Sequence, residues 1–151
     1  MGGKTVRMKR RQKTSSNESD RNTERALLLR DMMEDGETHW LLTRLASIHY
    51  EEGNYERALE LEKKALKRAP RCPLVLWDYA HTLDQMGRQL EAIGIWKKLL
   101  ARGTDRIAYD ECDEGIRWAR SLLLDCRYRI ALAYRSLGQT APGLNVTSSL
   151  T

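Results

Sequence analysis

Hydrophobic residues recur at intervals of three or four positions through most of the chain, which is the spacing of one face of an α-helix. Ala26, Leu29 and Met33 follow this spacing and predict a leading helix over 22–35 that ends at Gly36. Such a helix has one apolar face, and this face needs a neighbouring helix to cover it. The pattern therefore predicts helices that pack against one another.

Residues 39–70 are repeated in residues 73–104, at an interval of 34 positions. Each copy is predicted to form two amphipathic helices with a turn glycine between them, Gly53 in the first copy and Gly87 in the second. The identical pairs are Leu42 and Leu76, Ala46 and Ala80, Gly53 and Gly87, Ala58 and Ala92, Lys63 and Lys97, Lys64 and Lys98, Leu66 and Leu100, and Arg68 and Arg102. The repeat predicts two consecutive helical hairpins.

A longer helix follows the two repeats. Apolar residues at steps of three and four predict one helix over 114–137. The acid-rich residues 105–113 lack a clear period and predict a connecting loop, with room for one helical turn. Within the long helix, residues 127–138 resemble the first helix of a third repeat. They follow the matching residues of the second copy by 51 positions, whereas the two copies are 34 positions apart. The third repeat is therefore partial and carries an insertion.

Length, composition and charge describe the chain around these helices. Its 151 residues suit one domain, predicted over 21–138, and no apolar run approaches the roughly 20 residues of a membrane span. The net charge is +5, but six of the 26 lysines and arginines fall within residues 1–13, where there is no acid. The basic excess therefore belongs to an N-terminal tail, 1–20, which is predicted to be disordered, as is the C-terminal tail 139–151.

The repeated segment resembles the tetratricopeptide repeat family. The first copy has small residues, a turn glycine and a terminal proline at the family's places: Ala46, Gly53, Tyr55, Ala58, Ala65 and Pro70. It departs from the family at Glu62, where an aromatic residue is common; the second copy has Trp96 there but lacks the closing proline. The resemblance implies an all-α fold, a right-handed stack of helix-turn-helix hairpins with two full repeats and a long C-terminal capping helix.

The resemblance also implies a partner-binding groove lined by the first helix of each repeat. The family's groove positions fall on Trp40, Thr43, Ser47, Tyr50 and Glu51 in the first copy, on Leu74, Trp77, His81, Asp84 and Gln85 in the second, and on Tyr128, Leu132 and Arg135 in the partial third. Tryptophan, tyrosine and arginine dominate the energies of protein interfaces. The alternative that Trp40 and Trp77 only pack against neighbouring helices stays open.

Catalytic chemistry has little support in the sequence. There is no phosphate-binding glycine loop, nucleophile elbow or paired metal-ligand motif, so we expect no enzyme, no cofactor and no metal site. Cys126 lies on the apolar stripe of the long helix, whereas Cys72, next to Pro73, is expected to be exposed. Cys112 completes an odd number of widely spaced cysteines, which fits a reducing compartment better than a disulfide framework. No secretory signal is seen, so we expect a cytoplasmic protein.

These observations favour a protein-protein interaction module or scaffold with a protein or peptide partner of unknown identity. Two alternatives are kept. One is a self-associating structural subunit, since a terminal hairpin face could be covered by a second copy. The other, less favoured, is nucleic-acid binding through Lys9, Arg10, Arg11 and Lys13 of the tail. Basic residues from Arg102 to Arg135 are all arginine, which suits an acidic partner, although pairing with the chain's own acids is the simpler expectation.

Overall fold

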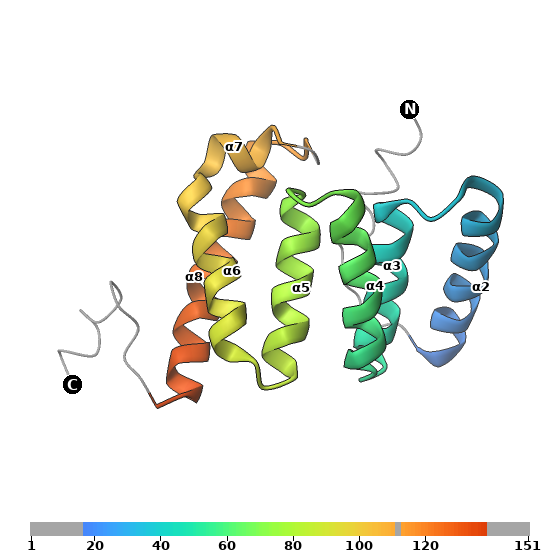
Figure 1. The fold of residues 1–151 in the computed structure, drawn as a ribbon, viewed down its shortest axis with the longest axis horizontal. Coiled ribbons are helices and arrows are strands. Elements are labelled where there is room, and N and C mark those ends of the chain that lie inside the picture. The colour runs from blue at the N-terminus through green and yellow to red at the C-terminus, as the bar shows by residue number, and fades with distance from the viewer. Residues whose placement is uncertain (1–16, 111–112, 139–151) are drawn as a thin grey trace. The chain divides into compact units, whose positions relative to one another are not determined.

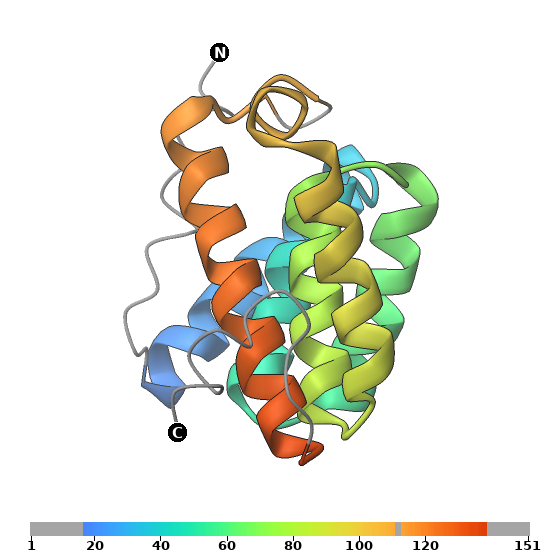
Figure 2. The same ribbon diagram turned by 90° about the vertical axis from the view of Figure 1, so that its left-hand side faces the viewer.

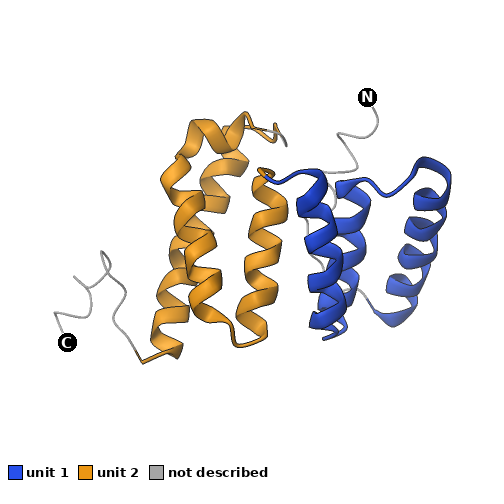
Figure 3. Ribbon diagram, in the orientation of Figure 1, with its two compact units in different colours: residues 1–70 blue, residues 71–151 orange. Residues whose placement is uncertain are grey.

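The computed structural model describes residues 17–110 and 113–138, and this part of the chain consists of seven helices without a strand (Figure 1). The predicted all-α fold of helical hairpins is confirmed. The chain divides into two compact units, residues 1–70 and 71–151, where the sequence predicted one domain (Figure 3). The boundary falls directly after Pro70, the end of the first repeat. The predicted tails over 1–16 and 139–151 lie outside the described residues.

Unit 1 contains helices α2 (Glu18–Asp35), α3 (His39–Glu51) and α4 (Tyr55–Arg68). Helices α3 and α4 form the hairpin of the first repeat, and α2 packs against α3. The leading helix begins at Glu18, four residues before its predicted start, so residues 18–20, which were predicted to belong to the tail, are helical. The cause is a cap, because the side-chain oxygen of Asn17 accepts a hydrogen bond of 2.8 Å from the backbone N–H of Asp20.

Unit 2 contains helices α5 (Pro73–Gln85), α6 (Gln89–Arg102), α7 (Thr104–Ala108) and α8 (Ile116–Ser136). Helices α5 and α6 form the second hairpin, and α8 runs antiparallel to α6 and also contacts α5 (Figures 1 and 2). Helix α7 is the helical turn allowed for in the predicted loop, and it packs against α6 and α8. Helix α8 starts two residues later than predicted, since Gly115 at its N-cap has a φ of 93°.

The two hairpin turns are built alike. Gly53 and Gly87 have φ values of 79° and 80°, in the left-handed region that a residue with a Cβ rarely adopts. In the first turn the N–H of Asn54 donates to the carbonyl of His49 at 2.8 Å. In the second, the N–H of Arg88 donates in the same way to the carbonyl of Leu83 at 2.9 Å. Both turns are Schellman motifs, which satisfy the last carbonyls of the preceding helix.

Small residues lie where the paired helices pack most closely. Ala46 and Ala58 in the first hairpin, and Ala80 and Ala92 in the second, are at most 1% exposed. Trp96 on α6 is completely buried and fills the interior of unit 2. The sequence predicted this division between small residues at the helix contacts and large residues beside them.

The apolar stripe predicted for α8 faces the interior of unit 2. The buried members of that stripe are Ala119, Leu123, Cys126, Ile130 and Ala133. Burial raises the pKa of the Cys126 thiol to about 12, with a further contribution from the nearby negative charge of Asp125. Cys126 is therefore an inert core residue, as its position on the stripe predicted.

Candidate functional site

Helix α3 carries the predicted groove residues of the first repeat, and they differ in exposure. Trp40, Ser47 and Tyr50 are half-buried, and the Tyr50 ring meets that of Tyr55 edge to face at 5.3 Å between centroids. Thr43 is completely buried, and its hydroxyl donates a hydrogen bond of 2.7 Å to the carbonyl of His39. The prediction that Thr43 lines a groove is therefore wrong, since its side chain faces the packed interior and bonds its own helix.

Helix α5 carries the predicted groove residues of the second repeat. Leu74 is 2% exposed and belongs to the core, so its assignment to a groove is also wrong. Trp77 and His81, one turn apart, are half-buried and meet edge to face with 4.6 Å between ring centroids. The His81 ring also contacts that of Trp96 at 5.5 Å. Helix α5 thus presents two partly exposed rings above a buried tryptophan.

Asp125 on α8 joins these rings to the other side of unit 2. Its carboxylate accepts a hydrogen bond of 2.7 Å from the indole N–H of Trp77, and the same oxygen lies 3.4 Å from Nε2 of His81. Its second oxygen lies 3.4 Å from Nε of Arg129. Trp77, His81, Asp125 and Arg129 form a cluster that we call the α5–α8 polar cluster. Sequence reasoning missed Asp125, although it is the one acid among five arginines in α8.

The electrostatics of the cluster favour an ionised Asp125. Partial burial pushes its pKa upward, but the hydrogen bonds from His81 and Trp77 and the charges of His81 and Arg129 outweigh burial and leave the pKa below its ordinary value. The Nδ1 atom of His81 lies 2.8 Å from the carbonyl oxygen of Trp77, which can only accept, so this nitrogen carries a hydrogen.

The polar groups of this cluster make contacts with one another. Both nitrogens of His81 face oxygen atoms, and both oxygens of Asp125 have nitrogen partners. Two of these contacts, from Trp77 and His81 to Asp125, join α5 to α8, and the other two each lie within one helix. The arrangement orients Trp77 and holds the two helices together.

The remaining predicted residues lie on the exposed side of α8. Tyr128 is 60% exposed, Leu132 is at the edge of exposure, and Arg135 is exposed. Among the described residues, Arg129 on α8 pairs with Asp125 of its own helix, as the simpler expectation for the arginines of this segment predicted.

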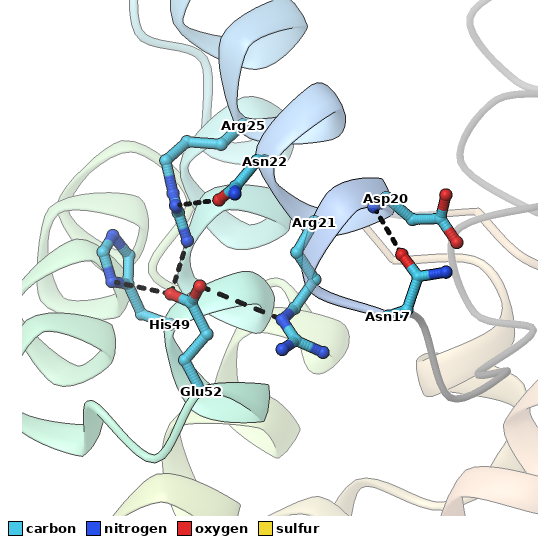
Figure 4. A network of polar contacts seen from close by, with 7 residues as sticks. All are labelled: Asn17, Asp20, Arg21, Asn22, Arg25, His49 and Glu52. Atoms are coloured by element: carbon cyan, nitrogen blue, oxygen red, sulfur yellow. Dashed lines mark hydrogen bonds and ion pairs between the residues drawn. The ribbon is translucent and has the colours of Figure 1, made fainter.

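A second polar network lies in unit 1, between α2 and the end of α3 (Figure 4). Glu52, the C-cap of α3, is ion-paired with Arg25, and its carboxylate lies 3.8 Å from Nε of Arg21 and 3.9 Å from Nδ1 of His49. Burial lowers the pKa of His49, the positive charge of Arg25 lowers it further, and Glu52 opposes both. This network attaches α2 to the first hairpin through charge rather than through a broad apolar contact.

Metal and cysteine chemistry give no further site in the described part of the chain. No group of three or more histidine, cysteine or acidic side chains there is placed to hold a metal ion. Cys72 is completely buried and disulfide-bonded, so both its expected exposure and the expectation of cysteines without disulfides are wrong at this residue. No helix of the described residues is long and apolar enough to cross a membrane.

Comparison with known protein families identifies the first hairpin. Residues 41–72 match the model of the tetratricopeptide repeat, and this range covers most of α3, all of α4 and the following turn. The first hairpin is therefore a tetratricopeptide repeat, as the spacing of Ala46, Gly53 and Ala58 suggested. No curated protein and no solved structure gives a significant match to the chain.

Proposed function

We propose that the chain is a protein-interaction module that binds a segment of a partner protein without covalent chemistry. The observation that carries this proposal is the tetratricopeptide repeat at residues 41–72, since this repeat generally serves protein-protein contacts. The rigid construction of both hairpins supports it, because a preformed surface loses little conformational entropy when a partner binds.

The finer proposal is that a partner contacts the first helix of a repeat, α3 in unit 1 or α5 in unit 2, each as a surface of its own unit. Two features support this placement. Trp77 and His81 are partly exposed rings held in one orientation by Asp125, and oriented aromatic rings are effective interface anchors. On α3, Trp40 and Tyr50 are likewise partly exposed aromatic side chains. Thr43 and Leu74 take no part in the proposed surface because they are buried.

A non-catalytic role is part of the proposal, and its support is the mutual pairing within the α5–α8 polar cluster. Nucleic-acid binding through the basic residues 1–13 stays an alternative that concerns residues outside the described ranges. A cytoplasmic location stays a prediction, and the disulfide at Cys72 is the observation that weighs against it.

Site-specific photocrosslinking in the source cells tests the placement. A photoreactive amino acid replaces Gln85 on α5 or Glu51 on α3, both of which are exposed. Matched controls carry the same group at Lys98 on α6 and Lys63 on α4, which are exposed on the second helices. We expect a discrete crosslinked protein from α3 and α5 that is depleted in both controls.

The identified partner is then titrated against the purified chain and a Trp77→Ala variant. Weaker binding by the variant, with the chain still folded, supports the proposal. Equal crosslinking from first and second helices, or no specific crosslink at any of the four positions, would overturn the proposed surface.

A further inference from the structure

Helix α2 is attached to α3 by charged side chains more than by apolar ones (Figure 4). Its only buried residue is Leu28, whereas Leu29 is 45% exposed and Met33 is 88% exposed. Ion pairs from Glu24 and Arg25 of α2 connect it to α3. Because contacts of this kind separate at a smaller free energy than a hydrophobic core does, α2 can leave its place while the first hairpin stays folded.

The contact between α2 and α3 has a fixed order of charges. Oε1 of Glu24 lies 2.8 Å from Nη2 of Arg44, and Arg25 is ion-paired with Glu52. The carboxylate of Glu52 also lies 3.8 Å from Nε of Arg21. Because α3 presents a positive group within the helix and a negative group at its end, a uniformly charged partner such as a nucleic acid would meet repulsion at one of them. This side of α3 therefore suits a helix with the charges of α2.

The short linker between α2 and α3 can bend at one residue. Gly36 has a φ of 86°, and no atom lies within 4 Å of a Cβ added there. The residues after it are held in place, because the carboxylate of Glu37 lies 3.3 Å from both Lys64 and Arg68 of α4. The side chain of Thr38 caps α3. Rotation of the backbone at Gly36 therefore moves α2 and leaves α3 and α4 unchanged.

We propose that α2 is swapped between two copies of the chain, so that α2 of each copy packs on α3 of the other. This swapped dimer keeps every contact between α2 and α3 described above and differs from a single copy at the linker around Gly36. The complementary surfaces are therefore already present in the fold. Two copies satisfy each other completely, so the association closes at two. The proposal does not rest on the proposed function, because it assigns the contact between α2 and α3.

A side chain beside the linker supplies the gain of the swapped dimer. The two linkers pass each other at the two-fold axis, so residues next to Gly36 lie against the second copy. Met33 is one turn before Gly36 and is 88% exposed in a single copy, so it is covered in the dimer. Packing of α2 on α3 within one copy competes with the swap, since the linker keeps the two helices close. The share of dimer therefore depends on concentration.

Sedimentation velocity of the full chain across a concentration series measures the association. We expect species of one and two copies and nothing larger, with a share of dimer that rises with concentration. Met33→Ser should lower this share without unfolding the chain, because the side chain is exposed in a single copy. A wild-type chain that stays monomeric at every concentration, or a Met33→Ser chain that dimerises equally, would overturn the proposal.

A mixture of two charge variants distinguishes the swapped dimer from any other dimer. Glu24→Arg places two positive groups together within one chain, and Arg44→Glu places two negative groups together. Only a swapped dimer of one copy of each variant joins opposite charges at both contacts. Native mass spectrometry of the mixture should therefore show a mixed dimer, several-fold more abundant than the dimer of either variant alone. A chain that carries both substitutions should behave like the wild type.

Arg57→Glu and Glu60→Arg provide the matched control, because these residues form an ion pair of 2.8 Å within α4. A swap of α2 cannot bring them together again, so their mixture should show no such excess of mixed dimer. Thermal melts should show that every variant is folded. Absence of the excess for the Glu24 and Arg44 variants, or an equal excess in the control, would overturn the swap. The photocrosslinking at Gln85 tests α5 in unit 2, so either proposal can fail without the other.

Discussion

The indole N–H of Trp77 on α5 donates a hydrogen bond of 2.7 Å to the carboxylate of Asp125 on α8, across 48 residues of sequence. The bond connects the second repeat to the long helix that follows it. Because the acceptor is a charged carboxylate in a partly buried position, this bond is stronger than one between neutral groups. Trp77 is therefore both a link within unit 2 and a partly exposed ring.

Replacing Trp77 with Phe tests the link while keeping an aromatic ring in place. The variant leaves Asp125 without its indole donor, so we expect a loss of about 1–2 kcal/mol in the free energy of unfolding. Chemical denaturation of wild type and variant measures this loss. Trp40→Phe on α3 is a comparison within unit 1, and an unchanged stability of the Trp77 variant would contradict the role of the bond.

Acid should weaken the α5–α8 polar cluster. Because the pKa of Asp125 is lower in the folded chain than its ordinary value of 3.8, the unfolded chain binds a proton more readily between the two values. The stability that Asp125 contributes is therefore complete above its ordinary pKa and is lost as pH falls through the folded value. Asp125→Asn should flatten this part of a stability profile measured by denaturation between pH 2 and pH 6, bounds set roughly around the ordinary aspartate value. A profile identical to wild type would contradict the assignment.

His49 predicts a separate pH effect in unit 1, in a higher range. Its pKa is lowered from 6.5, so the folded chain binds a proton less readily than the unfolded chain. Stability should fall as pH drops from the ordinary histidine value toward the lowered one, and remain reduced below it. His49→Gln removes the titrating group and should abolish this step in thermal melts, while Asp125→Asn should retain it.

The close contacts at the alanines predict overpacking. Ala58 and Ala92 are completely buried, so Ala58→Leu or Ala92→Leu should destabilise the chain by about 1–3 kcal/mol. Glu56→Leu, on the exposed side of α4, should have little effect. Denaturant titrations compare the three variants, and equal small effects at all three positions would be inconsistent with the hairpin packing.

Replacing glycine with alanine should lower the stability of the chain at the two hairpin turns and raise it inside α6. Around Gly53, Gly87 and Gly94 no atom lies within 4 Å of an added Cβ, so substitution meets no steric clash at any of them. Gly53→Ala and Gly87→Ala force alanine into the left-handed region and should cost about 1 kcal/mol or more each. Gly94, inside α6, has no such φ, so Gly94→Ala should stabilise the helix by up to about 1 kcal/mol. Thermal melts of the three variants decide the signs.

Local signals predicted most of the helices. The repeat placed the two hairpins within a residue or two of the observed ends, because turn glycines and proline fix where helices stop. The start of α2 was missed, although Asn17 and Asp20 carry the spacing of a capping motif. The residues around this capping motif are mostly polar, and this composition led to the prediction of a disordered tail instead of a helix start.

The candidate site was harder to predict because burial and pairing depend on distant segments. Thr43 and Leu74 occupy positions that line a groove in the tetratricopeptide repeat family, but here they are buried in the interior. Asp125 interrupts a run of arginines and gives no sequence signal of its partners, Trp77 and His81, which lie on another helix. The ion-pair partners of the α8 arginines likewise depend on where the acids of the chain lie in space.

Helix α2 buries Leu28 alone, and it is attached to α3 through the charges around Glu52 and through the ion pair between Glu24 and Arg44. An element with so little apolar contact opens at a smaller free energy than the core around it, without unfolding of the hairpin. Its amide hydrogens should therefore exchange with solvent before those of α3 and α4, and added salt should accelerate that exchange selectively. Helix α2 is thus a separate cooperative segment, with an opening equilibrium set by ionic conditions rather than by the hydrophobic core.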